Sequence, residues 1–349
     1  MNSMASPQKQ SAFQDQYGRQ KRKLRISVTD RCNFKCVYCM PEHPQWMQKK
    51  DLLSFEELYQ FCQLMVQQGI EQIRITGGEP LMRQGVVHFI AQLHKLKPYG
   101  LKRIAMTSNA HYLQRYAYDL KQAGLDDINI SLDSLNPEQF KQLTQKELAP
   151  VLAGINAAKQ AGLRIKINTV LIKGVNENQI VPLVQWSHAQ GFEPRFIEFM
   201  PLDGDQHWSE NTVVTEQQIL EQLSTVFELQ IQQGQGANPA RCYLVNGNPV
   251  GIISTISHSF CADCDRLRLN AQGELFNCLF ATYGLNLQSQ IRSLATASVQ
   301  QRQLLEQQLS QYIWQKKSGY QQIQAEQLQR SQTTAVKTIR KISMHMLGG

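Results

Sequence analysis

The chain has 349 residues, of which 42% are hydrophobic, so it can bury a full core and is not disordered over most of its length. Its formal net charge is +8, but the basic residues are scattered, which suits a small anionic substrate at least as well as a nucleic acid. The sequence contains no apolar run near the length of a membrane span, about 18 residues. We therefore expect a globular protein that binds neither a membrane nor nucleic acid.

Six of the eight cysteines fall into two groups of three. Disulfides of a secreted protein are the alternative explanation, but no signal peptide is visible, and clustered cysteines favour bound metal in a reducing compartment. We therefore expect a cytoplasmic protein. Residues 1–23 are polar, rich in Gln and without an alternating apolar face, which predicts a flexible N-terminal arm.

From residue 24 to about 200, short runs rich in Ile, Val and Leu alternate with helical patterns. Helix starts are marked by Ser54 and by Asn136-Pro137. This rhythm predicts six parallel strands with right-handed crossovers and chemistry at their carboxyl ends. The predicted strands, which read as buried on both faces, are 24–30, 71–76, 102–107, 127–132, 163–172 and 194–200.

Three cysteines follow the first predicted strand with C-x3-C-x2-C spacing, at Cys32, Cys36 and Cys39. A [4Fe–4S] cluster has four irons, so three thiolates leave one iron able to bind a small molecule. A structural zinc knuckle is the alternative, but zinc prefers four protein ligands and two-residue spacing within a pair. We interpret the loop as a cluster site with one open iron.

Polar motifs also follow the next three strands. Thr76-Gly77-Gly78-Glu79-Pro80 follows the second strand, and its paired glycines let backbone approach a ligand. Thr107-Ser108-Asn109 ends the third strand and Ser131-Leu132-Asp133 the fourth. Each motif alone could be a turn or a cap, but in series at successive strand ends they indicate one site.

Residues 201–349 do not continue this rhythm and form a separate C-terminal region. Asn246-Gly247 and Gln272-Gly273 are typical of hairpin turns. The segment Cys261–Arg268 has the pattern C-x2-C-x-R-L-R, and Cys278 follows fourteen residues after Cys264. These are again three cysteines without a fourth. The chain ends on apolar residues followed by Gly348-Gly349.

The first cysteine motif together with T-G-G-E-P resembles the radical S-adenosylmethionine (SAM) enzymes, in which SAM binds the open iron. The second motif and the terminal glycines are similar to those of the GTP 3′,8-cyclases, the radical SAM family that begins molybdenum cofactor biosynthesis. The similarity runs from about residue 21 to the end of the chain. It implies an α/β fold, a partial (β/α)6 TIM-like barrel over residues 24–200, with a cluster-binding extension over residues 201–349.

By motif position, the resemblance implies roles for individual residues. The ligands of the SAM-binding [4Fe–4S] cluster would be Cys32, Cys36 and Cys39, and those of a second [4Fe–4S] cluster would be Cys261, Cys264 and Cys278. The SAM-binding residues would be Tyr38, Gly78, Ser131 and Met200. The GTP-binding residues would be Arg25, Arg74, Thr107, Lys166, Arg266, Leu267 and Arg268. The catalytic tail inside the active site would be Gly348 and Gly349.

Physical reasoning supports the basic residues of this set. Arg25 and Lys166 lie on otherwise apolar strands, where a charge without a partner is costly. An anionic ligand would satisfy them, and an internal salt bridge is the competing explanation for each. Arg195 is a further candidate outside the set.

The implied reaction converts GTP and SAM to (8S)-3′,8-cyclo-7,8-dihydroguanosine 5′-triphosphate, 5′-deoxyadenosine and methionine, using an external electron donor. The product would pass to cyclic pyranopterin monophosphate synthase. One alternative is a radical SAM enzyme whose second cluster binds a peptide, against which R-L-R and the terminal glycines argue. The oligomeric state is left open, a homodimer included.

Two other classes of protein are disfavoured. Two closed electron-transfer clusters would need eight cysteine ligands, but Cys62 falls on the buried stripe of a predicted helix and Cys242 lies far from a C-x2-C pair. A zinc-stabilised RNA-binding module would need a basic patch with interleaved aromatic residues, and aromatic residues make up only 8% of the chain without forming such a stripe.

Overall fold

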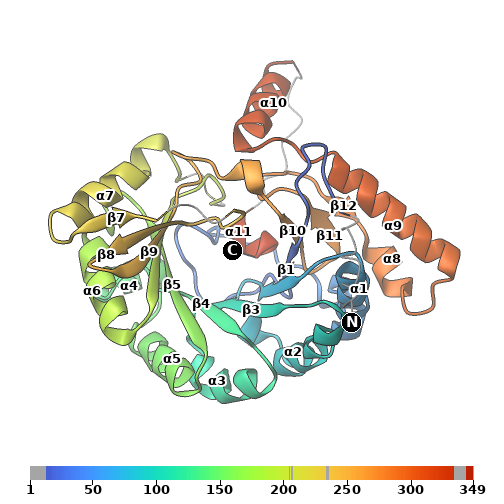
Figure 1. Ribbon diagram of the computed structural model, residues 1–349, viewed down its shortest axis with the longest axis horizontal. Helices are drawn as coiled ribbons and strands as arrows, with labels where there is room; N and C mark the ends of the chain where they lie inside the picture. Colours follow the sequence, from blue (N-terminus) through green and yellow to red (C-terminus); the bar gives the residue numbers. More distant parts are fainter. Residues whose placement is uncertain (1–12, 204, 206, 233–235, 334–342, 349) are drawn as a thin grey trace, which may run out of the picture.

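One curved sheet of 12 strands organises the computed structural model, which describes residues 13–203, 205, 207–232, 236–333 and 343–348 (Figure 1). The strand order is β12-β11-β10-β1-β2-β3-β4-β5-β6-β9-β8-β7. The six central strands are parallel: β1 (Lys23–Ser27), β2 (Gln72–Thr76), β3 (Arg103–Ser108), β4 (Asp127–Ser131), β5 (Arg164–Leu171) and β6 (Glu193–Glu198). The predicted partial (β/α)6 barrel is confirmed.

Helices surround the outside of the central strands (Figure 1). They are α1 (Phe55–Gln67), α2 (Val86–His94), α3 (Leu113–Gln122), α4 (Pro137–Thr144), α5 (Ala149–Gln160) and α6 (Ile180–Gln190). Two predicted helix starts are confirmed. Ser54 caps α1, since its side chain accepts a hydrogen bond from the Glu57 N–H at 3.1 Å, and Asn136 caps α4 ahead of Pro137.

Each central strand has one apolar and one polar face. Side chains such as Ile26 and Ile75 are fully buried in the core, whereas Arg25 and Arg74 line a central cavity. Alternate residues of a strand point to opposite faces, so the arginines and the isoleucines of one strand separate cleanly. The interpretation of these strands as short apolar runs buried on both faces is wrong for the inner face, which lines the cavity with charged and amide side chains.

The C-terminal region extends the same sheet at both edges. β9 (Asn248–Ile253) pairs in parallel with β6, and β10 (Arg266–Leu269) pairs in parallel with β1. The remaining strands are β7 (Leu229–Ile231), β8 (Arg241–Val245), β11 (Glu274–Phe276) and β12 (Leu285–Asn286). The remaining helices are α7 (Glu216–Ser224), α8 (Gln288–Ser293), α9 (Val299–Trp314), α10 (Tyr320–Thr333) and α11 (Met344–Leu347).

Both predicted hairpin turns are present in this region. Gly247 lies between β8 and β9, Gly273 lies between β10 and β11, and both have positive φ, at 78° and 90°. The short helix α11 lies inside the ring of strands (Figure 1). No helix among the described residues is long and apolar enough to span a bilayer.

Residues 13–22 are packed into the protein. Phe13, Asp15 and Lys21 are fully buried, and Gln14 forms an antiparallel bridge with Gln20. The prediction of a flexible arm is wrong for this stretch, because Asp15, Arg19 and Lys21 are buried in ion pairs and not solvated. Residues 1–12 of the predicted arm lie outside the described residues.

Replacing Phe13 with Ala should lower the free energy of unfolding by about 3–5 kcal/mol, since the ring is fully buried. Tyr17→Ala is the matched control, because 49% of Tyr17 is exposed, and its cost should stay near or below about 1 kcal/mol. Anaerobic urea titrations of the full chain measure both. Equal costs for the two variants would show that the segment is not part of the core.

Candidate active site

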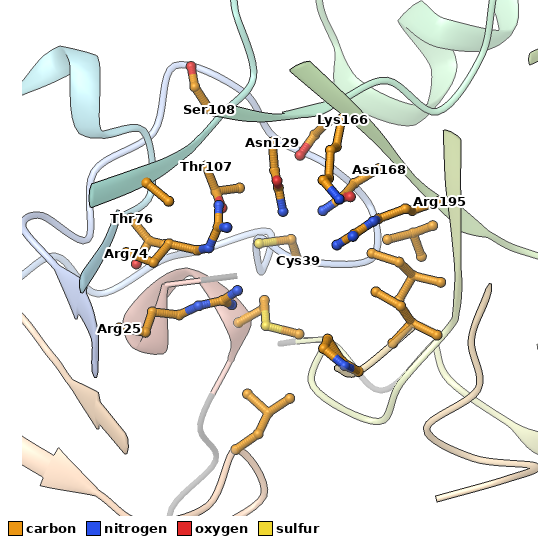
Figure 2. Close-up of a pocket in the computed structure, with 18 of the residues that line it drawn as sticks. Arg25, Cys39, Arg74, Thr76, Thr107, Ser108, Asn129, Lys166, Asn168 and Arg195 are labelled. Carbon is orange, nitrogen blue, oxygen red and sulfur yellow. The ribbon is translucent and has the colours of Figure 1, made fainter. Parts of the chain in front are cut away.

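A cavity of about 510 Å³ occupies the interior of the barrel and reaches the loops that follow the central strands. Sites for small molecules usually have volumes of about 300–1,000 Å³. All six central strands contribute lining side chains, as do β9, β10 and Met344 of α11. Figure 2 shows that many of these side chains point toward a common centre.

The three cysteines that follow β1 lie together at this cavity. The Cys39 N–H donates to the Cys36 carbonyl at 3.0 Å, and the Cys32 Sγ accepts a contact from Asn109 Nδ2 at 3.8 Å. Burial, with a further contribution from the Glu79 carboxylate, raises the pKa of Cys32 to about 12, and burial also raises the pKa of Cys36 and Cys39. Buried thiolates need a cation to be stable, and the three free thiols fit the donor set of an iron–sulfur cluster with one open iron.

The second group of cysteines lies beside Arg266. Its guanidinium Nη2 is 3.7 Å from the Cys264 Sγ. Burial alone would raise the pKa of Cys264, but the charges of Arg266 and Lys316 lower it to about 6. In the described part of the chain, no three His, Cys, Asp or Glu side chains converge on a position suited to a single metal ion. In a cluster each thiolate would bind a different iron, and the free thiols of Cys261, Cys264 and Cys278 stay the predicted ligands of a second cluster.

Three arginines lie side by side across adjacent strands. Arg25 on β1 is in register with Arg74 on β2 and with Arg268 on β10. Burial lowers the pKa of Arg25 well below its ordinary value, and the charges of Arg268, Arg74 and Arg266 lower it further. No carboxylate of the described residues counters these shifts. We call Arg25, Arg74 and Arg268 the arginine row, and its crowded positive charge favours an anionic ligand.

Salt bridges account for several basic side chains of the cavity, Arg74 of the arginine row included, because its Nη2 lies 3.4 Å from Asp127 Oδ1. Glu193 pairs with both Lys166 (2.6 Å) and Arg195 (2.7 Å). The competing explanation of an internal salt bridge therefore holds for Lys166, whereas no carboxylate of the described residues pairs with Arg25. Lys166 and Arg195 still point into the cavity, where two cations share one carboxylate (Figure 2).

Three buried polar atoms at the cavity have no hydrogen-bond partner among the described residues. They are Thr107 Oγ1, Asn129 Oδ1 and Asn168 Oδ1. Thr107 and Asn129 are neighbours across β3 and β4, and Asn168 follows on β5 (Figure 2). Leaving a buried polar atom without a partner is costly, so these atoms favour a ligand that carries hydroxyl groups.

The C-terminal tail reaches the arginine row. The Gly348 carbonyl oxygen accepts hydrogen bonds from Arg25 Nη1 at 3.1 Å and Arg268 Nη1 at 3.4 Å. Gly348 has a φ of 73°, and a Cβ at this position would lie 1.9 Å from Thr76 Oγ1. Only glycine fits here. Gly349 lies outside the described residues.

Comparison with known proteins connects this geometry to a family. The family model for the radical SAM superfamily matches residues 26–187, and the model for Molybdenum Cofactor Synthesis C matches residues 192–322. The GTP 3′,8-cyclase of Streptomyces coelicolor is 43% identical over 287 residues, which cover 80% of this chain and 84% of that protein. The chain belongs to the GTP 3′,8-cyclase family. The GTP 3′,8-cyclase of Brucella canis is 38% identical over 282 residues, covering 80% and 82%.

Solved structures support the fold. Streptococcus suis SuiB bound to S-adenosylmethionine has a TM-score of 0.59 at 15% identity, covering 74% of this chain and 60% of that one. SuiB bound to its precursor peptide SuiA has a TM-score of 0.59 at 13% identity, covering 77% and 64%. The chain thus spans less than two thirds of these solved chains. At identities this low, the likeness supports the fold alone and gives no information about the substrate.

Most residues that the GTP 3′,8-cyclase resemblance implied lie around the one cavity. Those that line it are Cys32, Cys36, Cys39, Tyr38, Gly78, Ser131, Met200, Arg25, Arg74, Thr107, Lys166, Arg266 and Arg268. Leu267 differs, because its side chain points to the other face of β10 and is fully buried in the core. The three cysteines of the second group are not among the described residues that line the cavity, but the adjacent residues Phe260 and Leu279 are. The individual ligand roles stay predictions.

Sequence reasoning missed Asn129 and Asn168 and left Arg195 outside the proposed set. A signal was available, because Asn129 precedes Ser131 by two residues and Asn168 follows Lys166 by two. Residues two apart on a strand share a face, so each asparagine faces the same side as a residue already assigned. The interpretation of the strands as buried on both faces concealed this pattern.

Glu79 of T-G-G-E-P is a fully enclosed carboxylate behind the first cysteine loop. It accepts hydrogen bonds from Ser108 Oγ at 2.9 Å, the Asn109 N–H at 2.8 Å and the Leu81 N–H at 3.1 Å. Burial outweighs these bonds and raises the pKa of Glu79 from 4.5 to about 7. The motif therefore carries a buried carboxyl group that loses its proton at a higher pH than an ordinary glutamate does.

The stability of the protein should depend on pH through this group. A pKa raised by folding gives a contribution that is complete below about pH 4.5 and is lost as the pH rises through about 7. Between about pH 5 and about pH 8, the free energy of unfolding of the unmodified chain should fall by about 2–3 kcal/mol through the ionisation of Glu79. Glu79→Gln cannot ionise, so it should not show this part of the decrease. Anaerobic urea titrations at the two pH values test this, with the exposed Glu138→Gln as control. A difference that stays constant with pH would contradict the assignment.

Proposed function

We propose that this protein converts GTP and SAM to (8S)-3′,8-cyclo-7,8-dihydroguanosine 5′-triphosphate, 5′-deoxyadenosine and methionine, the first step of molybdenum cofactor biosynthesis. Membership of the GTP 3′,8-cyclase family supports the reaction. The structural observation that carries it is the arginine row, which faces the same cavity as the first cysteine loop. An anionic substrate and a cluster would therefore share one cavity.

The arginine row and its neighbours would bind the nucleotide. Guanidinium groups pair with phosphate oxygens through two parallel hydrogen bonds, and Arg25 needs such a partner more than the others do. The acceptor atoms of Thr107, Asn129 and Asn168 suit the hydroxyl groups of a ribose. Together these groups would hold a triphosphate and a sugar in the barrel.

The cysteines would hold two [4Fe–4S] clusters, one on Cys32, Cys36 and Cys39 and one on Cys261, Cys264 and Cys278. When bound, the reduced first cluster and SAM would supply the radical chemistry that removes hydrogen from C3′ of GTP, and the C3′–C8 bond would then be completed with one electron from the external donor and one proton. The protein itself orients the reactants and excludes water. Tyr38 is fixed beside the first site by its hydroxyl, which donates to Asp133 Oδ2 at 2.6 Å.

The tail would complete the substrate site. The Gly348 carbonyl holds Arg25 and Arg268 in place, and its partial negative charge offsets part of their positive charge. With both guanidinium groups already oriented, less conformational entropy is lost when phosphate binds. Gly349 would continue this segment in the active site.

Three further features belong to the proposal. The enzyme would work in a reducing compartment with an external electron donor, because eight cysteines are free thiols. Its product would pass to cyclic pyranopterin monophosphate synthase. A peptide substrate is the less favoured alternative, since the buried arginine row suits phosphate groups better than a peptide backbone.

Anaerobic turnover with GTP and SAM tests the function. The unmodified protein should form cyclised nucleotide and 5′-deoxyadenosine. Cys36→Ser should abolish 5′-deoxyadenosine formation and keep the absorbance of the second cluster, because it removes one thiolate of the first site. Cys264→Ser should keep 5′-deoxyadenosine formation and lose the cyclised nucleotide. Undiminished cleavage of SAM by Cys36→Ser would sink the assignment.

Replacing Gly348 with Ala should lower the rate of GTP cyclisation by at least about tenfold, because the new Cβ would clash with Thr76 and displace the carbonyl from Arg25. Deletion of Gly348 and Gly349 should have the same effect. SAM cleavage and iron content should stay near those of the unmodified chain. Gly191→Ala is the control, since Gly191 also has positive φ but a Cβ there meets open space. Normal yields of cyclised nucleotide from Gly348→Ala would show that the tail is an ordinary terminus.

A further inference from the structure

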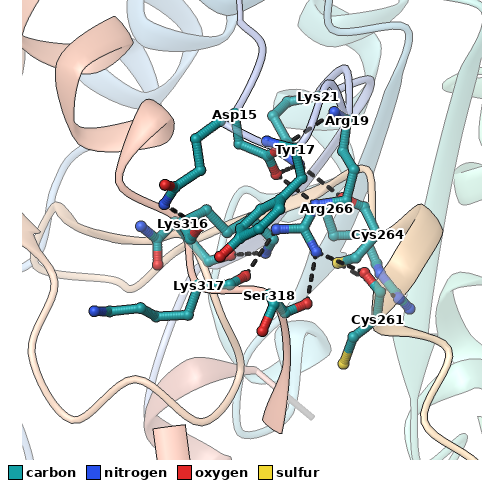
Figure 3. A network of polar contacts seen from close by, with 12 residues as sticks. Asp15, Tyr17, Arg19, Lys21, Cys261, Cys264, Arg266, Lys316, Lys317 and Ser318 are labelled. Atoms are coloured by element: carbon teal, nitrogen blue, oxygen red, sulfur yellow. Dashed lines mark hydrogen bonds and ion pairs between the residues drawn. The ribbon is translucent and has the colours of Figure 1, made fainter. Parts of the chain in front are cut away.

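The N-terminal segment and the second cysteine group meet in a buried polar network (Figure 3). Lys21 donates from Nζ to the Cys264 carbonyl at 2.7 Å. Arg19 donates from Nη1 to the Cys261 carbonyl at 2.7 Å. Both cations also bind one carboxylate oxygen, Asp15 Oδ2, at 2.6 Å each. Two cysteines of the second group are thus held through their backbone by residues far away in the sequence.

The third cysteine is held in the same way from a neighbouring segment. Lys316 Nζ donates to the carbonyl of Asn277, which directly precedes Cys278. Arg19 ties the two segments together, because its guanidinium also donates to the carbonyls of Lys317 (2.7 Å) and Ser318 (2.8 Å). Gly319 allows this segment to lie close to Cys261, since a Cβ at position 319 would lie 2.8 Å from the Cys261 Cβ.

These contacts are buried and specific. Arg19, Lys21 and Lys316 are at most 7% exposed, and Asp15 is fully buried. Asp15 is itself fixed, because its Oδ1 accepts the backbone N–H groups of Tyr17 (3.0 Å) and Arg19 (3.1 Å). Charge-assisted hydrogen bonds between enclosed groups are among the strongest in proteins. Arg19 and Lys21 share the Asp15 carboxylate, and Lys316 adds a third cation near Lys21. Their excess positive charge lies beside thiols that must lose protons to bind iron.

We propose that Asp15, Arg19, Lys21 and Lys316 form a clamp that positions Cys261, Cys264 and Cys278 for the second cluster. The inference rests on the proposed second cluster at these cysteines. Arg19, Lys21 and Lys316 donate to backbone carbonyls beside or within the cysteine segments, and Asp15 holds Arg19 and Lys21, so all four are positioning residues. The described part of the N-terminal segment is in this sense a piece of the second cluster site.

The clamp is tested with Arg19→Gln and Lys21→Met in the full-length chain, reconstituted anaerobically. The matched control is Arg22→Gln, because Arg22 is exposed in the same segment and its side chain binds Gln20. Iron and acid-labile sulfide are measured, together with the rate at which a chelator removes iron. A Cys36→Ser background identifies the phase of iron loss that belongs to the second cluster.

The unmodified chain should hold about eight irons, as two [4Fe–4S] clusters require. In Arg19→Gln and Lys21→Met, loss of the second cluster to the chelator should accelerate by at least about tenfold, as expected when a buried charge-assisted hydrogen bond is removed. The first cluster should still cleave SAM to 5′-deoxyadenosine at the unmodified rate. Arg22→Gln should behave as the unmodified chain.

Asp15 distinguishes positioning from a direct role. Asp15 contacts none of the three cysteines in the described structure, so Asp15→Asn should accelerate cluster loss only through Arg19 and Lys21. Combining Asp15→Asn with Lys21→Met should therefore give less than the product of the two separate accelerations. Independent, multiplicative effects would contradict the clamp.

The outcomes separate the clamp from the proposed function. Two clusters of unmodified stability in both single variants would overturn the clamp alone. Loss of both clusters together would also overturn it, because the network would then support the whole fold and not one site. A single cluster in the unmodified chain would overturn the second cluster and the clamp together.

Discussion

The register of β1 with its two neighbours is the constraint on which the site depends. Parallel pairing with β2 and β10 brings Arg25, Arg74 and Arg268 to one level of the barrel. Three guanidinium groups in a buried row repel one another and lose hydration, which is tolerated only where negative or polar groups face them. The Gly348 carbonyl faces Arg25 and Arg268, and Asp127 pairs with Arg74, whereas no carboxylate of the described residues pairs with Arg25. The same strand leads directly into the first cysteine loop, so substrate charge and cluster thiols are placed by one element.

The outer face of the central strands stabilises the fold, and the inner face carries the side chains of the candidate site. The outer face carries fully buried residues such as Ile26 and Ile130, which pack into the core with the helices. The inner face carries charged and amide side chains that the barrel encloses. Because these groups are held on strands and not on mobile loops, their positions are set before a ligand arrives, which reduces the reorganisation that binding requires.

Both ends of the described chain, which are not part of the repeating strand–helix units of the barrel, contribute to the site. The tail places Gly348 against the arginine row, and the segment around Asp15 reaches the carbonyls of the second cysteine group. Each end is polar or glycine-containing and lies far in sequence from its contacts. The barrel is open between its outer strands, and segments from the ends of the chain supply contacts that further βα units would supply in a closed barrel.

The sequence by itself determined the alternation of strands and helices over residues 24–200, the caps at Ser54 and Asn136, the hairpin glycines and the two cysteine motifs. These features depend on local spacing and backbone preference, which neighbouring residues carry. Only the tertiary structure decided that Arg25, Arg74 and Arg268 share one level, because register between strands distant in sequence depends on the packing of the whole sheet. It also decided that Lys166 has an internal partner and that Asp15, Arg19 and Lys21 are buried, since a polar sequence does not reveal whether its charges meet water or one another.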